Sequence, residues 1–158
     1  ELYVFHGGAS NHHDWWISGL KENLEVPEAR DLDEVRYGLG VAKMRKDGFV
    51  SIRAGAEPGT LITKPIKLGR LAERLTVNFL THKGGDIRVG IEEVNGKVIA
   101  DYSPADCKPL QGDSLSQNVT WKSGADISHL RRKYPVVRLR FELKKADLYS
   151  MQFQPWLR

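Results

Sequence analysis

The fold of this chain is decided by the stretch Val137-Arg138-Leu139-Arg140-Phe141-Glu142-Leu143, in which apolar and charged residues alternate without exception. Successive side chains of a β-strand point to opposite faces of the sheet, so a period of two collects the apolar side chains on one face and the charged ones on the other. We therefore expect one face of this strand to lie on a hydrophobic core and the other to face water.

Three further segments show the same period of two. Their apolar positions are Leu75, Val77 and Phe79; Ile87, Val89 and Ile91; and Tyr149, Met151 and Phe153. Each row is expected to point inward. Helical periodicity is almost absent from the chain, which predicts an all-β domain.

Turn-forming residues separate these segments. Asn95-Gly96 is the strongest hairpin signal, because both residues accept the positive φ angles of a tight turn. It is expected to join a strand at 87–94 to a short strand at 98–100, and Asp47-Gly48 and Gly84-Gly85-Asp86 carry similar turn chemistry. Further strands are expected at 41–45, 49–53, 61–63 and 116–121. A total of about nine or ten strands predicts an antiparallel two-sheet β-sandwich of the jelly-roll or concanavalin A-like type.

Composition divides the chain into three parts. Residues 1–18 open directly on a strand-like run without an initiator Met, which indicates a closing strand or a remnant of an upstream domain, in an excised or processed chain. Residues 19–39 are polar and predict a connector. Residues 40–158 are expected to form the sandwich module, and its segment 104–112 is predicted to be a long loop of the kind that often carries function.

Composition and charge also argue against two classes of function. The 158 residues carry a net charge of +4, but 24 basic residues are interleaved with 20 acidic ones, whereas nucleic-acid binders concentrate their basic residues on one face. No apolar run is long enough to cross a bilayer. We therefore expect neither a nucleic-acid partner nor a membrane. The single cysteine, Cys107, excludes an intramolecular disulfide and is expected to be a small buried hydrophobe.

Two groups of residues are candidates for ligand binding. His13, Trp15 and Trp16 belong to the cluster of residues 7–16, in which aromatic and polar side chains adjoin. His12 and His13 would point to opposite sides of an extended segment, so we expect no zinc site there. The alternative for this cluster is structural, with the polar side chains bonding a loop and the indoles packing on the sandwich.

The second group is Tyr102, Asp106 and Asp113, at and beside the loop 104–112. Sugar binding by a sandwich needs an exposed aromatic face for the pyranose ring and polar groups for its hydroxyls, and these residues offer both at a sheet edge. Buried aromatic residues are more common than ligand-stacking ones, so core packing stays an alternative. A structural calcium ion held by loop oxygens is also left open, although no dedicated calcium loop is present.

No catalytic residue is predicted. The serines lack a Gly-x-Ser-x-Gly elbow, and no local motif pairs Cys107 with a histidine. Asp101, Asp106 and Asp113 carry the carboxylates that glycoside hydrolysis uses, but the sequence does not give their separation.

Four stretches resemble a known framework. They are Asp47-Gly48-Phe49-Val50-Ser51-Ile52, Gly59 through Ile66, Asp113 through Lys122, and Val137 through Ser150. Together, across residues 40–154, they look like the C-terminal β-sandwich of glycosidase-like proteins similar to glycoside hydrolase families 32 and 43. In those proteins the sandwich follows a catalytic five-bladed β-propeller, and residues 2–16 look like the end of such a propeller.

The resemblance implies a lectin-like accessory module with two partners, a glycan and an upstream β-propeller domain of the same protein. We expect a non-catalytic module that binds carbohydrate weakly. The alternatives are a purely structural or interaction domain that packs on the propeller, which predicts a large exposed apolar patch, and a small stand-alone glycoside hydrolase, which requires a pocket with convergent titratable groups. The sequence does not give the compartment, and the glycosylation sequon Asn118-Val119-Thr120 would matter only if the protein is secreted.

Overall fold

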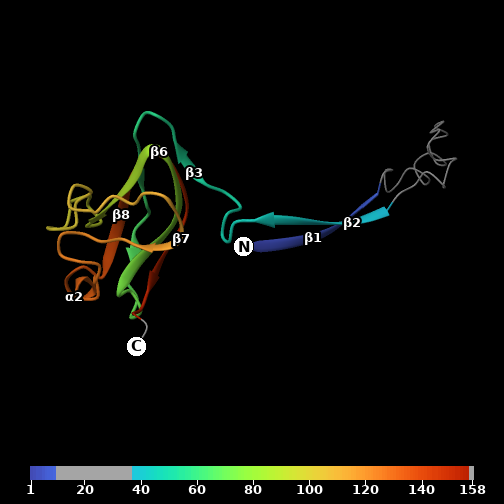
Figure 1. Cartoon of the computed structure of the whole chain (residues 1–158). Helices are drawn as coiled ribbons and strands as arrows, with labels where there is room; N and C mark the ends of the chain where they lie inside the picture. The colour runs from blue at the N-terminus through green and yellow to red at the C-terminus, as the bar shows by residue number, and fades with distance from the viewer. Residues whose placement is uncertain (10–36, 157–158) are drawn as a thin grey trace, which may run out of the picture. The chain divides into compact units, whose positions relative to one another are not determined.

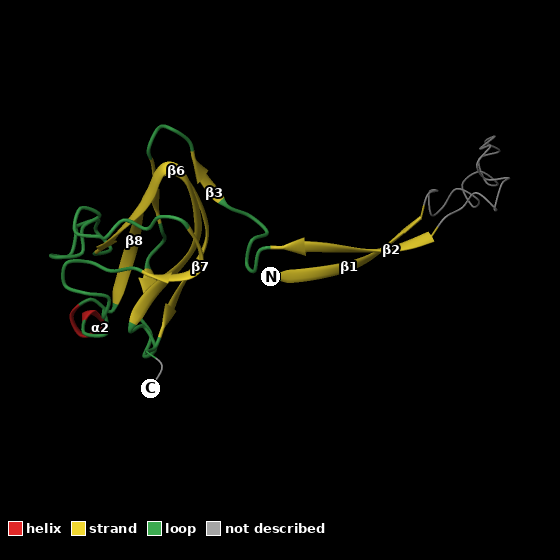
Figure 2. Cartoon of the chain, viewed as in Figure 1, coloured by secondary structure: helices red, strands yellow, loops and turns green. Residues whose placement is uncertain are grey.

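The computed structural model describes residues 1–9 and 37–156. The chain is all-β, with two antiparallel sheets and one short helix among these residues (Figures 1 and 2). It divides into two compact units, Glu1–Lys46 and Asp47–Arg158. The boundary follows Lys46, so residues 40–46, which we expected in the sandwich module, belong to the first unit; most of the expected connector, 19–39, lies outside the described residues. No helix in the described part of the chain is long and apolar enough to cross a membrane.

The first unit contains a two-stranded ribbon. Strand β1 (Leu2–Ala9) pairs antiparallel with β2 (Tyr37–Met44), in a register that places Phe5 opposite Val41. Gly40 lies opposite His6, and a Cβ atom at position 40 would come within 2.5 Å of the His6 ring. The missing side chain of Gly40 therefore allows the His6 ring to lie across β2.

The second unit contains a six-stranded sheet with two long central strands. The pair is β6 (Arg74–Glu92) and β8 (Val136–Gln154), which run antiparallel from Arg74 opposite Gln154 to Glu92 opposite Arg138. Strands β3 (Ile52–Ala54), β4 (Gly59–Ile62) and β5 (Ile66–Lys67) pair with successive parts of β8, and β7 (Asp113–Asn118) pairs with β6. The helix α2 (Leu130–Lys133) directly precedes β8.

The described residues form eight strands, fewer than the nine or ten expected. The rows at 75–79 and 87–91 are two parts of the single strand β6, and those at 137–143 and 149–153 are two parts of β8. Irregularities between Asn78 and Phe79 and between Thr81 and Asp86 let the ladder continue where a break was expected. The turn at Asn95-Gly96 is confirmed, with Gly96 at φ 88° and its N–H donating to the carbonyl of Glu93 at 2.9 Å, but in place of the short strand expected at 98–100 there is only an isolated bridge between Glu92 and Val98.

The core lies on the predicted face of both central strands. The side chains of Val137, Leu139, Phe141 and Leu143 are all buried, as are the apolar rows of β6. Further along β8 the alternation is interrupted. The irregularity after Asn78 places Leu148 opposite Phe79 and leaves Tyr149 without a paired residue on β6, so Leu148 instead of Tyr149 faces the core. Met151 and Phe153 pack against the core as expected.

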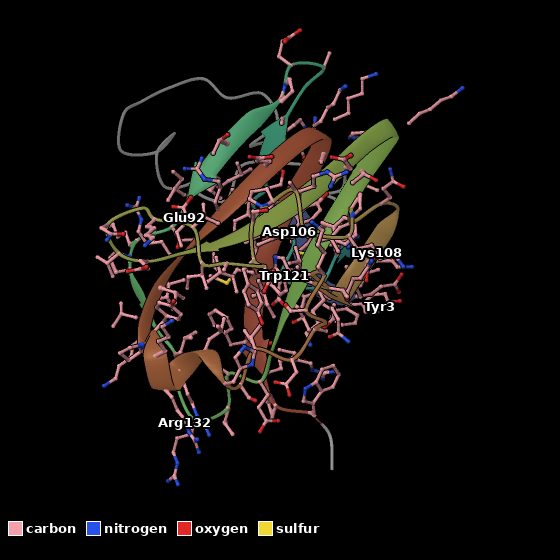
Figure 3. All side chains as sticks on the ribbon, turned by 90° about the vertical axis from the view of Figure 1, so that its left-hand side faces the viewer. Tyr3, Glu92, Asp106, Lys108, Trp121 and Arg132 are labelled. Atoms are coloured by element: carbon pink, nitrogen blue, oxygen red, sulfur yellow. The ribbon has the colours of Figure 1, made fainter. Side chains whose placement is uncertain are left out.

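The segment between β6 and β8 covers this core. It contributes a set of buried side chains, namely Ile99, Tyr102, Cys107, Leu110, Val119, Trp121, Ile127 and Leu130. Its backbone is tied to β6 by hydrogen bonds from Ile91 N–H to Tyr102 C=O at 2.8 Å and between Ile87 and Leu110. The Trp121 indole lies in the interior, whereas Arg132 of α2 projects away from the sheet (Figure 3).

Charged residues of the two central strands are arranged as complementary pairs. Register places Asp86 opposite Lys144 and Arg88 opposite Glu142, whereas the buried Glu92, opposite Arg138, forms its ion pair with Arg140, two positions further along β8. Opposite charges at facing positions stabilise one register against a slip by one residue. Gly90 lies on β6 between Arg88 and Glu92, at the position of this row that has no side chain. A Cβ atom there would come within 2.7 Å of Pro104 Cδ.

Candidate functional site

The strongest polar cluster of the second unit surrounds a buried carboxylate, that of Asp147 on β8. The side chain is 0% exposed and accepts hydrogen bonds on both oxygens. Oδ1 accepts from Arg53 Nε at 2.7 Å and from Ser51 Oγ at 2.9 Å, and Oδ2 lies 3.1 Å from His82 Nε2. We call Ser51, Arg53, His82 and Asp147 the Asp147 cluster.

Strand register brings these four residues together from three parts of the chain. Arg53 on β3 lies directly opposite Asp147, and Ser51 immediately precedes β3. His82 follows Thr81, the last residue of β6 that pairs with β8 before the ladder is interrupted. A carboxylate on the middle strand is thereby bonded from both neighbouring strands.

The hydrogen bonds keep the Asp147 carboxylate ionised. Burial by itself raises the pKa of Asp147, but the hydrogen bonds from Arg53, Ser51 and His82 lower it by more, so the pKa lies below its ordinary value. A buried charge is tolerated when its lone pairs are satisfied in this way.

Two members of the cluster reach solvent. The Arg53 side chain is 69% exposed and that of His82 is 51% exposed, although each donates one nitrogen to the buried carboxylate. Their outer nitrogens, Nη1 and Nη2 of Arg53 and Nδ1 of His82, have no protein partner among the described residues. The cluster therefore presents fixed nitrogen atoms to solvent.

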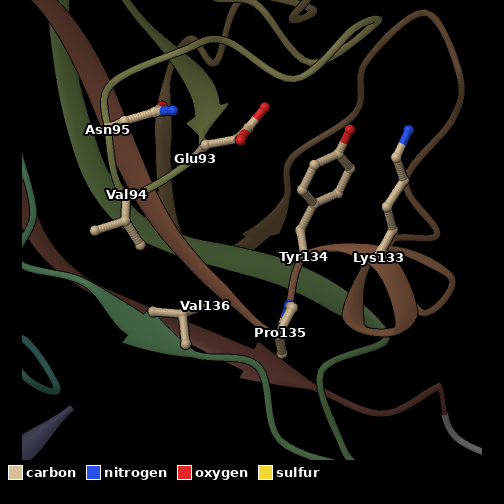
Figure 4. A pocket seen from close by; sticks show the side chains of 7 residues that line it. All are labelled: Glu93, Val94, Asn95, Lys133, Tyr134, Pro135 and Val136. Carbon is tan, nitrogen blue, oxygen red and sulfur yellow. The ribbon is translucent and has the colours of Figure 1, made fainter.

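A shallow depression lies elsewhere on the second unit, beside the Asn95-Gly96 hairpin. It has a volume of about 450 Å³ and is lined by residues 93–95 and 133–136. Figure 4 shows the Glu93 carboxylate directed toward the Tyr134 ring, with the Tyr134 hydroxyl and the Lys133 ammonium on the same side. Val94, Pro135 and Val136 supply the apolar part, and the Lys133 ammonium lies 5.2 Å from the Tyr134 ring centroid. The depression contains one carboxylate, fewer than the two that glycoside hydrolysis normally uses.

The ribbon of the first unit exposes an apolar face. The register of β1 and β2 puts five large side chains on the same face, and all are more than half exposed: Tyr3 52%, Phe5 79%, Tyr37 82%, Leu39 94% and Val41 53%. We call these five residues the ribbon stripe. Contiguous apolar surface of this kind in a folded protein commonly marks a contact with another protein surface.

Tyr102 does not present an exposed ring. It is 3% exposed, with its ring centroid 5.3 Å from that of Trp121 and its hydroxyl 3.2 Å from His129 Nε2. Trp121 in turn donates its indole N–H to the carbonyl of Val89 at 2.7 Å. The structure thus favours the core-packing alternative for Tyr102, and a sugar has no face of this ring to stack on.

The two predicted acidic ligands lie in different elements, Asp106 in the loop that follows Tyr102 and Asp113 at the start of β7. Asp106 accepts hydrogen bonds from the backbone N–H and hydroxyl of Ser103 and pairs with Lys122 Nζ at 2.5 Å, and these bonds lower its pKa. Asp113 begins β7, opposite Leu80. In the described part of the chain, no three side chains of His, Cys, Asp or Glu gather as they would around a metal ion. His13, Trp15 and Trp16 lie outside the described residues.

Sequence reasoning did not single out the Asp147 cluster or the depression. Ser51 and Arg53 are separated from Asp147 by more than ninety positions, and no spacing rule connects them. One signal was available: Asp147 is an acid between two apolar residues, Ala146 and Leu148, in a segment that is otherwise strand-like.

Comparison of the chain with protein-family models, with curated proteins and with solved structures found no match.

Proposed function

We propose that this chain is a non-catalytic accessory module that packs against a neighbouring β-sheet domain of the same protein through the ribbon stripe. The observation that carries this proposal is the exposure of five large apolar side chains on one face of a two-stranded ribbon. Burial of each such side chain stabilises an interface by about 1.5 to 3 kcal/mol. The five side chains of the ribbon stripe together therefore supply the apolar core of a stable contact.

The backbone of the ribbon supports the same type of partner. A two-stranded ribbon is at best marginally stable alone, and each of its strands has one edge without a partner among the described strands. A partner β-sheet can pair with an open edge of the ribbon, and it can also cover the apolar face of the ribbon. A β-propeller of the glycosidase-like type is the partner that the resemblance implies.

A sandwich or jelly-roll architecture for the second unit is part of this proposal. The two halves of β6, at 75–79 and 87–91, contribute to one core cluster although a bulged region separates them. A long strand that bends across a core in this way is typical of two-layer β-folds.

The test begins with the gene that encodes this chain. The region upstream of residue 1 is expressed separately, and its binding to the chain is measured by calorimetry. We expect saturable binding that Phe5→Ser and Leu39→Ser each weaken by about tenfold or more, because each removes a large apolar contact. Leu115→Ser is the matched control, since Leu115 is an exposed apolar residue of β7 in the other unit. A gene without an upstream β-domain, or binding indifferent to both ribbon variants, overturns the proposal.

Weak glycan binding at the Tyr134 depression is the second candidate function. The observation that favours it is the position of an aromatic ring beside a carboxylate, an amide and an ammonium group over an apolar base, the composition that sugar sites use. Titration with neutral oligosaccharides, followed by NMR shifts of residues 93–95 and 133–136, tests it. Tyr134→Ala is expected to abolish these shifts and Tyr37→Ala to leave them unchanged, whereas the absence of shifts for every oligosaccharide rejects this function.

A further inference from the structure

We propose that Arg53 and His82 form a binding site for an oxyanion group, a carboxylate or sulfate carried by a ligand, on the sheet of the second unit. This inference goes beyond the packing role and the glycan site, because it uses neither the ribbon stripe nor the Tyr134 depression. It follows from how the Asp147 carboxylate holds the two side chains.

The buried carboxylate acts as an anchor. Its Oδ1 is hydrogen-bonded to Nε of Arg53, and its Oδ2 is hydrogen-bonded to Nε2 of His82. Because both side chains are bound to one rigid group, they lie next to each other and lose less rotamer freedom when a ligand binds. Ser51 fills a further acceptor position of Oδ1, which fixes the carboxylate itself.

The remaining nitrogens suit an anion. Within the described part of the chain, Arg53 is engaged only through Nε, so its two terminal nitrogens are left in the planar fork that matches carboxylate and sulfate oxygens. Nε2 of the His82 ring is engaged with Asp147, so Nδ1 is the ring nitrogen left to face a ligand. Both side chains are more than half exposed, so a ligand reaches them without any displacement of protein.

The surrounding charges favour a negative ligand. The Asp147 charge is compensated within the cluster by Arg53. Lys83 follows His82 in sequence, and Lys144 and Lys145 precede Ala146 and Asp147. These three lysines face one further acid in the same two segments, Asp86, which is paired in register with Lys144. These two segments therefore carry more positive than negative charge in sequence, which favours an anionic ligand over a cationic one.

A purely structural role is the competing explanation. In that case the cluster only attaches β3 and the end of the first part of β6 to β8, and the outer nitrogens bind water. The two explanations differ in whether an added anion binds and in which substitutions affect it.

The experiment is an NMR titration of the whole chain with sodium sulfate, monitored at the Arg53 Nε–H and the His82 ring, with sodium chloride at equal ionic strength as reference. We expect saturable shifts at sulfate concentrations up to the order of 100 mM, the range for a small exposed site. Arg53→Gln is expected to weaken binding about tenfold and His82→Gln about fivefold, which corresponds to the loss of hydrogen bonds to a charged group. Lys83→Gln removes a charge from the adjacent position and is the matched control, with an expected change below about twofold.

Asp147→Asn separates a positioned site from general charge attraction. This substitution removes a negative charge, so general attraction predicts tighter sulfate binding, whereas loss of the anchor predicts weaker binding. Every variant is first checked for the wild-type circular dichroism spectrum, and if Arg53→Gln does not fold, Arg53→Lys keeps the charge without the fork and is expected to bind more weakly. Tighter binding by Asp147→Asn, equal effects of the Arg53 and Lys83 substitutions, or no saturable shift overturns the proposal.

Two further arms identify the source of the anion. Glucuronic acid and a sulfated disaccharide are titrated beside acetate and inorganic sulfate. An acidic saccharide that binds at least about fivefold more tightly than the free anion of the same class places the site on a glycan ligand. Equal affinities retain the oxyanion site but assign it to small anions.

Discussion

The ribbon and the six-stranded sheet are built from similar apolar sequence patterns but differ in what covers them. On β8, Leu139 and Phe141 alternate with charged residues and are buried to 0% and 1% exposure. On the ribbon, Tyr3 and Phe5 also occupy alternate positions, yet they are 52% and 79% exposed. The difference is that the segment between β6 and β8 covers the core side of the large sheet, whereas the two strands of the ribbon leave the ribbon stripe exposed. Alternation thus determines which side chains share a face, but the covering elements determine whether that face is buried.

The largest expected effect is a direct comparison of two phenylalanines. Phe141→Ala leaves a cavity in the core of the second unit and is expected to lower the free energy of unfolding by about 3 to 5 kcal/mol. Phe5→Ala removes a ring that is already in water, so we expect a change within about 0.5 kcal/mol. Urea unfolding followed by circular dichroism measures both, and equal losses would mean that the stripe is covered in the free chain.

Two glycines provide the next comparison. Gly90→Ala brings a Cβ within 2.7 Å of Pro104 Cδ and 3.3 Å of its backbone nitrogen, and is expected to destabilise the second unit by about 1 to 3 kcal/mol. A Cβ at Gly38, on β2 of the ribbon, meets no atom within 4 Å, so Gly38→Ala is expected to be neutral or to stabilise by up to about 1 kcal/mol. Thermal melts of the two variants check this, and a stable Gly90→Ala protein would show that the loop at Pro104 moves freely.

The Asp147 cluster predicts a pH-dependent contribution to stability. Since the folded-state pKa of Asp147 is depressed, its contribution is complete above the unfolded-state value of about 3.9 and is lost as the pH falls through the folded-state pKa. Asp147→Asn is expected to cost about 1 to 3 kcal/mol at pH 7, because the donors around a buried carboxylate lose their charged acceptor.

The measurement is urea unfolding of both proteins between pH 7 and pH 2. The difference between wild type and Asp147→Asn should shrink below about pH 4 as the wild-type carboxylate takes up a proton. A difference that stays constant through this range would contradict the assignment to the Asp147 charge.

The smallest expected effect is in the ribbon. Lys43 Nζ lies 2.6 Å from Glu1 Oε1, but the two side chains are 55% and 53% exposed, so water and salt screen the pair. Lys43→Gln is therefore expected to leave the urea midpoint unchanged within error. A clear shift of the midpoint would show that exposed charges contribute to the ribbon as the buried carboxylate of Asp147 contributes to the sheet.

Much of the fold followed from local pattern. The inward rows at 75–79, 87–91 and 137–143 and the Asn95-Gly96 turn were predicted because periodicity and turn propensity act over a few residues. The described residues form fewer strands than expected, because bulges let β6 and β8 continue across segments that local turn chemistry marked as breaks. Tyr149 was predicted to point inward because it continues a period of two. The irregularity beside Asn78 interrupts that period, and Tyr149 is not part of the core.

The candidate sites were less accessible to sequence reasoning. Tyr102 has the composition of a sugar-stacking residue, but its neighbours Trp121 and His129 are 19 and 27 positions away in sequence and bury its ring. The Asp147 cluster depends on β3 being paired with the far end of the chain, and that pairing is a property of sheet topology. The ligand predictions for His13, Trp15 and Trp16 concern residues outside the described part of the chain and stay predictions.

The sequence by itself determined the all-β class, the faces of the main strands and the tightest turn, because these depend on the alternation of side chains and on the backbone preferences of single residues. Only the tertiary structure decided which apolar face is covered, which acids are buried and which cations surround them. These properties arise from strand pairings and covering segments that are distant in sequence, and the free energy of burial depends on such neighbours more than on the buried residue alone.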